Sequence, residues 1–415
     1  MHEKPDIQSN GASGAPVPLM VDPAFMLLFS IHLKGAFNGF GALPPAIAPR
    51  PPAQSGDYVA RLAEFETRLL GKTFQEAERL ARVPLGRVPL DGLPEHAPPH
   101  ADVYLLAHKS GVALWEVWLP APRQPFDGAR WIDWLDAEAG DNVIARLWQA
   151  LGPVNENITG KPTWSGLYFP VTLLRVPQHS LEAVVERHGT DLVHLLFLDH
   201  SRRVFKPELV ADELGRDYCA RDGGMTLLAR RSGLDVHGRE DLAEEGQPTD
   251  QPPRSALPFL ITLELLLIER AVLAHLYQRL SRRMPASVDE LLALKQEVID
   301  ALEEYYGAII NATRFSDAVT ADGERLLGLG DLYDAVMNRL DAVSFAITTR
   351  YQRRMTLLQF WLTVVFGATE IGFIASSIAT WYYQTGLGAV LGWTIGGSVV
   401  SGLLLIGLLY GKVKD

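Results

Sequence analysis

LLQFWLTVVFGATEIGFIASSIATWYY (residues 357–383) decides the fold of the C-terminal part of this chain. A second apolar stretch covers residues 386–410, and each exceeds the roughly 20 residues that a helix needs to cross a bilayer. Only the residues around Gln384 and Thr385 separate the two stretches. We therefore expect residues 356–415 to form a transmembrane hairpin of two helices, with spans at about 357–383 and 386–410.

Basic residues flank the hairpin on one side only. They are Arg350, Arg353 and Arg354 before the first span, and Lys412 and Lys414 after the second. The connection between the spans has no charge, so the positive-inside rule places both ends of the hairpin in the cytoplasm. This pattern predicts a multi-pass protein of the cell (inner) membrane, in contact with lipid, with both termini cytoplasmic.

A carboxylate, Glu370, lies near the middle of the first span, where a charge costs at least ~3 kcal/mol. It belongs to a polar stripe with a spacing of seven residues: Thr356, Thr363, Glu370, Ser377 and Gln384, with Gln359 on the same face. Residues seven apart share one side of a helix in a left-handed bundle. The stripe predicts a pore or ion site; the alternative is that Glu370 only bonds Thr394 or Ser398 in a plain anchor.

The second span has a different pattern, in which Gly388, Gly392 and Gly396 form GxxxGxxxG. Small residues at this spacing let helices approach closely in lipid. We expect the first span to line a central axis and the second to pack around it. One hairpin cannot enclose a pore, so this arrangement requires a homo-oligomer.

The rest of the chain divides by composition. Residues 1–18 are polar and rich in Gly and Pro, which is typical of a disordered tail. Residues 19–240 mix strand and helix patterns and predict an α+β or α/β cytoplasmic domain of undetermined topology. Residues 241–255 are interpreted as an acidic linker. Residues 256–355 have coiled-coil spacing and predict a stalk of long helices.

Several elements are predicted within these regions. Residues 101–120 favour a β-hairpin with Lys109, Ser110 and Gly111 at its turn, and residues 192–205 suggest a second hairpin. Helical spacing marks residues 58–82 and 131–151. Residues 256–283 are apolar enough for a third span, but Glu264 and Glu269 favour a buried helix of a soluble domain.

The stalk is expected to break once and then continue into the membrane. Residues 314–331 contain Asp-Gly and Gly-Leu-Gly and are interpreted as an interruption. Nothing stops the helix that follows before the first span. We therefore expect one helix of roughly 50 residues, on the order of 75 Å long.

Composition excludes several classes of function. The formal net charge of −11 argues against a nucleic acid polymer as partner, and the single cysteine cannot form an intramolecular disulfide. No HExxH, GxSxG or kinase motif occurs, so we expect no enzyme and no cofactor other than a divalent cation such as magnesium. Four arginines remain as candidate ligands for phosphate groups: Arg202, Arg203, Arg230 and Arg231.

This order of parts resembles the CorA-type divalent-cation channels: a cytoplasmic α/β domain, long helices, a helix continuing into the first span, a short outer connection and a basic end, GKVKD. The resemblance implies a homo-oligomer, with a pentamer among the expected states, that transports metal ions. The family's Gly-Met-Asn motif is absent, and Tyr383-Gln384-Thr385-Gly386 stands in its place. Two alternatives stay open: an effector pore gated by a nucleotide signal, and a membrane-tethered interaction protein without conduction.

Overall fold

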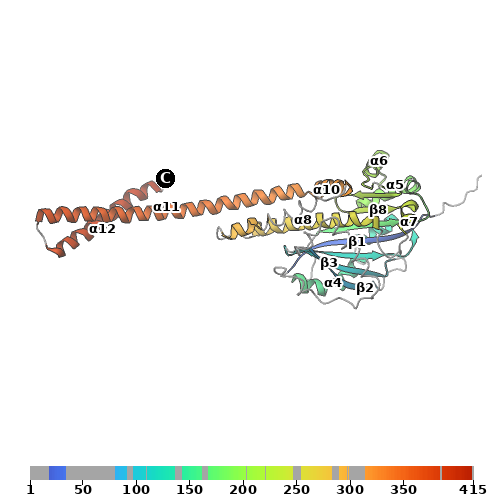
Figure 1. Cartoon of the computed structure of the whole chain (residues 1–415), viewed down its shortest axis with the longest axis horizontal. Coiled ribbons are helices and arrows are strands. Elements are labelled where there is room, and N and C mark those ends of the chain that lie inside the picture. Colours follow the sequence, from blue (N-terminus) through green and yellow to red (C-terminus); the bar gives the residue numbers. More distant parts are fainter. Residues whose placement is uncertain are drawn as a thin grey trace, which may run out of the picture. The chain divides into compact units, whose positions relative to one another are not determined.

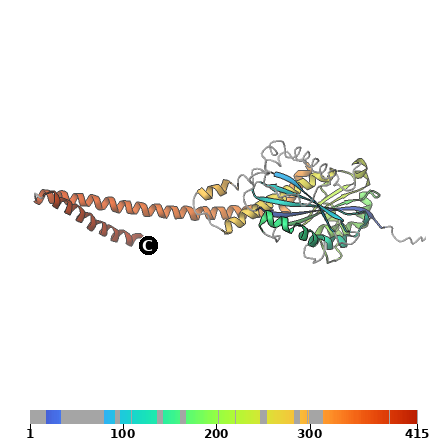
Figure 2. The ribbon, with the colours of Figure 1, turned by 90° about the horizontal axis from the view of Figure 1, so that it is seen from below.

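The computed structural model describes residues 18–33, 80–90, 97–108, 110–135, 143–160, 167–201, 203–219, 221–245, 254–282, 289–296, 298, 314–383 and 386–413. The chain divides into two compact units (Figures 1 and 2). The first comprises Met1–Arg283 and Ala293–Met337, and the second comprises Met284–Leu292 and Asn338–Asp415. The two units are described separately below.

The first unit is built on an eight-stranded mixed sheet with the order β2-β3-β4-β1-β6-β8-β7, and β5 pairs with β1 beside this path. The strands are β1 (Met20–His32), β2 (Leu80–Pro89), β3 (His100–His108), β4 (Val112–Pro120), β5 (Gln124–Pro125), β6 (Tyr168–Arg175), β7 (Gly224–Leu228) and β8 (Gly233–His237). All neighbouring pairs are antiparallel except β6 and β8, which are parallel. This sheet confirms the mixed class that the sequence predicts.

Helices cover one face of the sheet and enclose its larger core. They are α3 (Gly128–Leu135), α4 (Val143–Thr159) and α5 (Leu181–Phe197), and α6 (Pro207–Leu214) packs on α5. Alternate residues of β1 point to this side, where Phe25 meets Trp131 at a ring-centroid distance of 5.7 Å and Phe29 meets Trp148 at 4.6 Å. The central strands are therefore buried on this face by large aromatic side chains.

Helix α8 (Leu257–Arg282) covers the opposite face, where it contacts β4 and β1, and Figure 1 shows it running along the sheet. The short helices α7 (Arg239–Glu245) and η2 (Arg254–Ala256) precede it. A methyl group added at Gly233 of β8 would lie 2.8 Å from the Phe259 ring, so the glycine lets the helix approach the sheet closely. The sequence-based prediction that residues 256–283 form a buried helix is confirmed.

Helix α10 (Arg314–Leu327) packs on α8, so most of the predicted interruption at residues 314–331 is helical and the break within it is limited to Gly328. Gly323 does not break the helix, because a methyl group there would lie only 2.5 Å from the Leu266 Cδ1 atom. The glycine serves close packing between the two helices. The chain turns instead at Gly328, whose φ of 66° suits glycine.

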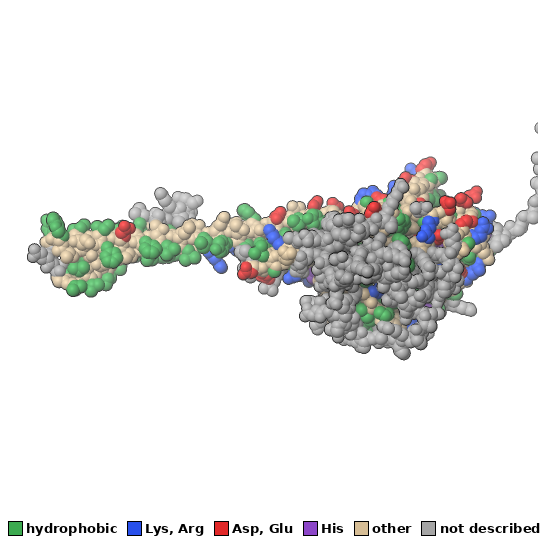
Figure 3. All heavy atoms as spheres, viewed as in Figure 1, with side chains coloured by type: hydrophobic (Ala, Val, Ile, Leu, Met, Phe, Trp, Pro, Cys, Tyr) green, Lys and Arg blue, Asp and Glu red, His purple; other side chains and the backbone are tan. Residues whose placement is uncertain are grey.

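Two long helices follow: α11 (Leu329–Tyr383) has 55 residues and α12 (Leu387–Val413) has 27. Both are long and apolar enough to cross a membrane. The expectation that one uninterrupted helix enters the first apolar stretch is thus confirmed. Figure 3 shows mainly apolar side chains over α11 and α12, whereas acidic and basic side chains gather on the first unit.

The remaining local predictions have mixed outcomes. Strands β3 and β4 form the predicted hairpin at residues 101–120, and the described parts of the predicted helix, residues 131–135 and 143–151, fall in α3 and α4. The second hairpin at residues 192–205 is wrong, because residues up to Phe197 belong to α5, which starts at a Ser180 cap and ends at Leu198 in the left-handed conformation. The helix at residues 58–82 lies mostly outside the described residues, and its last part belongs to β2.

Candidate functional site

Helices α11 and α12 pack through small residues. An added methyl group at Gly372 would overlap the Ser398 side chain and lie 2.6 Å from the Thr394 carbonyl oxygen. One turn earlier on α11, the Ala368 carbonyl oxygen lies 3.3 Å from the Ser401 hydroxyl, which donates to the Gly397 carbonyl oxygen of its own helix at 2.6 Å. Because the backbones approach this closely, α12 covers one side of α11.

The polar stripe lies on another side of α11. The side chains of Thr356, Gln359, Thr363, Glu370 and Ser377 are all exposed, whereas Val364, Ala368 and Ser376 are buried. Gln384, the last member of the stripe, lies outside the described residues. The structure therefore brings five of the six predicted residues to a surface that α12 leaves open.

Three hydroxyl groups of the stripe donate hydrogen bonds to backbone carbonyl oxygens of their own helix. Thr356 donates to the Gln352 carbonyl oxygen at 2.9 Å, Thr363 to Gln359 at 2.8 Å and Ser377 to Phe373 at 2.9 Å. A hydroxyl has one proton and two lone pairs, so these oxygens can only accept further hydrogen bonds or bind a cation. Together with the Glu370 carboxylate, they form a row of electron-pair donors, which suits cations and not anions.

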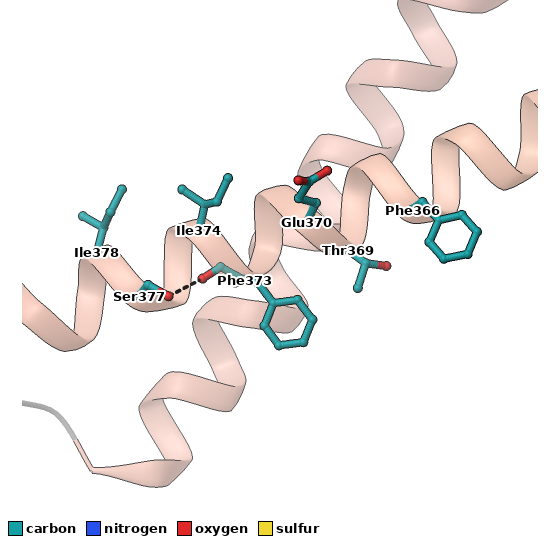
Figure 4. A pocket seen from close by; sticks show the side chains of 7 residues that line it. All are labelled: Phe366, Thr369, Glu370, Phe373, Ile374, Ser377 and Ile378. Carbon is teal, nitrogen blue, oxygen red and sulfur yellow. Dashed lines mark hydrogen bonds between the residues drawn. The ribbon is translucent and has the colours of Figure 1, made fainter.

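Glu370 has no partner among the described residues. It forms no hydrogen bond and no ion pair there, and it borders an open groove of about 650 Å³. Figure 4 shows its carboxylate on the same side of the helix as Ile374 and Ile378, with Thr369 and Ser377 also lining the groove. The alternative bond to Thr394 or Ser398 is not formed within the chain, since Thr394 donates to Val390 and Ser398 contacts Gly372.

The glycines predicted to pack the second span lie away from α11. A methyl group added at Gly388, Gly392 or Gly396 would meet nothing within 4 Å. Inside the hairpin, contact is made instead by Gly397, Ser398 and Gly402. The GxxxGxxxG ridge is free for contacts with another molecule, and its role in packing stays a prediction.

The four arginines proposed as ligands are not gathered into one site by the described contacts. Arg202 lies outside the described residues, and Arg203 follows α5 on the surface. Arg230 and Arg231 are exposed at the turn between β7 and β8. No described hydrogen bond or ion pair links Arg203 with this turn.

Sequence analysis missed a buried charge cluster at the end of β8. The His237 Nε2 atom lies 2.8 Å from Asp235 Oδ2, and its Nδ1 atom lies 2.7 Å from Asp241 Oδ2. Burial alone would lower the pKa of His237, but the two carboxylates outweigh burial and raise it to about 9. The doubly protonated ring then donates to both acids, and only the strand-to-helix geometry reveals that residues 235, 237 and 241 meet.

This cluster holds the first unit together near the start of α8. The Ser255 hydroxyl of η2 donates to Asp241 at 3.1 Å, and the Thr226 hydroxyl of β7 donates to Asp235 at 2.7 Å. Both ring nitrogens of His237 are engaged, so the imidazole has no free position for a substrate. Among the described residues, no group of three or more His, Cys, Asp or Glu side chains is arranged to bind a metal ion.

Comparisons with known proteins identify no relative: no family model matches the chain, and neither the curated proteins nor the solved structures include a match. Of the layout on which the predicted resemblance rests, the structure shows a mixed α/β body, a long helix and a C-terminal apolar helix.

Proposed function

We propose that the protein is a homo-oligomeric membrane cation channel of CorA-like layout, with the polar stripe of α11 lining its axis. The observation on which this rests is the placement of Glu370 on a membrane-length helix, away from the helix that packs against α11. A carboxylate facing lipid costs at least ~3 kcal/mol. If several copies surround a hydrated axis, their Glu370 carboxylates face water and not lipid, and this cost is removed. The cation site is therefore incomplete without the other copies.

Each stripe residue has a role in this proposal. Glu370 is the intramembrane cation site, Thr363 and Ser377 are polar rungs on either side of it, and Thr356 and Gln359 lie toward the cytoplasmic entrance. Gln384 would stand at the outer mouth. Divalent cations, magnesium among them, are the proposed cargo, and under this proposal the protein is not an enzyme.

The location follows the flanking charges. The basic residues before α11 and at the end of α12 support an inner-membrane protein with both termini in the cytoplasm. The GxxxGxxxG ridge of α12, which is unused within the hairpin, supports contacts between copies or with lipid.

Ion flux into proteoliposomes tests the proposal. The purified protein is assayed with magnesium, cobalt, sodium and potassium separately, together with Glu370→Gln, Glu370→Asp and the off-stripe control Ser401→Ala. We expect flux of at least one cation, a loss of about tenfold or more in Glu370→Gln and substantial retention in Glu370→Asp, because the charge acts on the ion. Unchanged conductance and ion preference in Glu370→Gln would refute the assigned role.

If the wild type shows no flux of any of the four ions, the alternative functions have to be considered. If the oligomer is intact, a membrane-tethered interaction protein is then favoured. That alternative predicts that residues 1–355 joined to an unrelated membrane anchor restore function. A pore gated by a nucleotide signal instead predicts that flux appears when the ligand is added.

A further inference from the structure

The turn between β7 and β8 presents two adjacent arginines on a fixed support. Arg230 and Arg231 are its central residues, and the Ala229 amide donates to the Ser232 carbonyl oxygen at 2.9 Å. The Ser232 hydroxyl in turn donates to the Leu196 carbonyl oxygen at the end of α5. A backbone hydrogen bond and the Ser232 side chain therefore both fix the conformation of this turn. The backbone that carries the two guanidinium groups is held in place.

Helix α8 passes beside this turn. A methyl group at Gly323 of α10 would lie 2.5 Å from Leu266 Cδ1 and 3.5 Å from Leu228 Cδ2, so the end of β7 adjoins α8 at Leu266. Arg270 lies one helical turn after Leu266 on the same face of α8. Arg230 follows Leu228, the last residue of β7, by two residues and lies in the turn that continues this strand.

Among the described residues, these arginines have no acidic partner. Arg270 is half-buried, Arg230 and Arg231 are exposed, and none of the three forms a hydrogen bond or ion pair in the described part of the chain. Burial lowers the pKa of Arg270, and the positive charge of Arg230 lowers it further, in line with the closeness of Leu228 and Leu266. The neighbouring Glu269 forms no ion pair with them among the described contacts; burial, and then the charge of Glu324 on α10, raise its pKa.

We propose that Arg230, Arg231 and Arg270 form a binding site for a phosphate-bearing ligand. Guanidinium groups bind phosphate oxygens in pairs, and arginines that form no ion pair in the described part of the chain provide a local positive charge in a protein of net charge −11. A bound phosphoryl group supplies the missing counter-charge. This inference does not depend on ion conduction, so the two can fail separately.

Calorimetric titration of the full-length protein in detergent with sodium pyrophosphate tests the site. We expect binding that weakens as salt is raised, and a loss of affinity of about tenfold or more in Arg230→Gln and in Arg270→Gln. The matched control is Arg216→Gln, since Arg216 is also exposed but is paired with Asp212 and Glu213 on α6. This control should bind like the wild type.

Thermal unfolding separates lost binding from lost folding. Removing Arg230 relieves repulsion, so Arg230→Gln should unfold at the same or a higher temperature than the wild type without ligand, and pyrophosphate should raise the midpoint only for the wild type and Arg216→Gln. A parallel flotation assay with vesicles of phosphatidylglycerol and phosphatidylcholine distinguishes the sources of phosphate. Binding of pyrophosphate supports a soluble ligand, and arginine-dependent binding of vesicles alone supports a lipid headgroup. Absence of both, or equal binding by all variants, overturns the proposal.

Discussion

The Nδ1 atom of His237 lies 2.7 Å from the Oδ2 atom of Asp241, which joins the last strand of the sheet to helix α7. Asp235 engages the other ring nitrogen, so the folded protein holds a buried imidazolium between two carboxylates. In the unfolded chain the same ring titrates near pH 6.5. The cluster therefore links the stability of the first unit to pH.

The first prediction is a loss of stability between pH 6.5 and about 9. The pKa of His237 is raised to about 9 in the folded state, so its contribution is complete below pH 6.5 and falls as pH rises through 9. The difference in pKa corresponds to about 3 kcal/mol. Chemical unfolding of the protein at a series of pH values measures it.

Two variants check the origin of this effect. His237→Gln should remove the dependence on pH in this window and cost about 3–5 kcal/mol at pH 6.5, because two buried carboxylates lose their cation. His200→Gln, a change at an exposed histidine near Asp133, should leave the profile unaltered. A pH profile of His237→Gln that matches the wild type would show that another group is responsible.

The second prediction concerns Glu269, a buried carboxylate on α8 that faces Glu324 on α10. Burial, and then the charge of Glu324, raise the pKa of Glu269 to about 7. Because the folded pKa exceeds the ordinary value, folding stability decreases as pH rises from about 4.5 to 7, and the penalty is complete above pH 7. Glu269→Gln should therefore stabilise the protein by up to about 3 kcal/mol at pH 8 and have little effect at pH 4.5.

Unfolding of Glu269→Gln at these two pH values tests the sign directly. Glu324→Gln serves as the comparison: it removes the repulsion and leaves Glu269 buried, so its gain at pH 8 should be smaller. Equal stabilisation of Glu269→Gln at pH 4.5 and 8 would contradict the assignment, because a neutral glutamic acid already resembles glutamine.

The third prediction concerns Arg82, which joins β2 to β4 and α8. Its guanidinium group donates to both carboxylate oxygens of Glu264, at 3.1 and 2.5 Å, and forms an ion pair with Glu116. All three side chains are at most 5% exposed. Arg82→Gln should cost about 3–5 kcal/mol in chemical unfolding, because it leaves buried carboxylates without this cation.

Arg87→Gln is the matched control for this pair. Arg87 lies on the same strand and binds Asp102 at 2.7 Å, but its side chain is 29% exposed. Water can replace the lost contact there, so the expected cost is about 1 kcal/mol. Similar losses for both variants would mean that burial does not set the strength of the Arg82 contacts.

The sequence predicts the hairpin and the long helix well because their signal is local. Hydropathy alone locates α12 and the apolar part of α11, and the spacing of seven residues finds the face on which Glu370 lies. The clusters of the first unit depend instead on contacts between distant segments. Arg82 and Glu264 are 182 residues apart in sequence, and no periodic pattern links them.

Glycine illustrates the same limit at single residues. From the sequence, Gly323 is expected to break a helix. In the structure it lies within a helix, and its missing side chain allows close contact with Leu266. Residues 192–205 alternate enough to suggest a hairpin, but the Ser180 cap and the burial of Leu192, Leu195 and Leu196 on one side favour a helix. Only tertiary packing decides between these alternatives.

The last prediction separates contacts within the hairpin from contacts between copies. Gly372→Ala should destabilise the α11–α12 pair by about 1–3 kcal/mol, because the new methyl group overlaps Ser398 and approaches the Thr394 carbonyl oxygen at 2.6 Å. Gly392→Ala adds the same group where nothing lies within 4 Å, so the hairpin itself should be unaffected. Reversible unfolding in mixed micelles measures both variants.

The oligomeric state in detergent completes the comparison. If the ridge of Gly388, Gly392 and Gly396 packs against another copy, Gly392→Ala should shift the protein toward smaller species while its hairpin stays intact, since a methyl group keeps the helices apart. Gly402→Ala is a useful intermediate, because its methyl group would lie at an ordinary 3.5 Å from Ala368 within the chain. An unchanged oligomer in Gly392→Ala would assign the ridge to lipid and leave the polar face of α11 as the contact between copies.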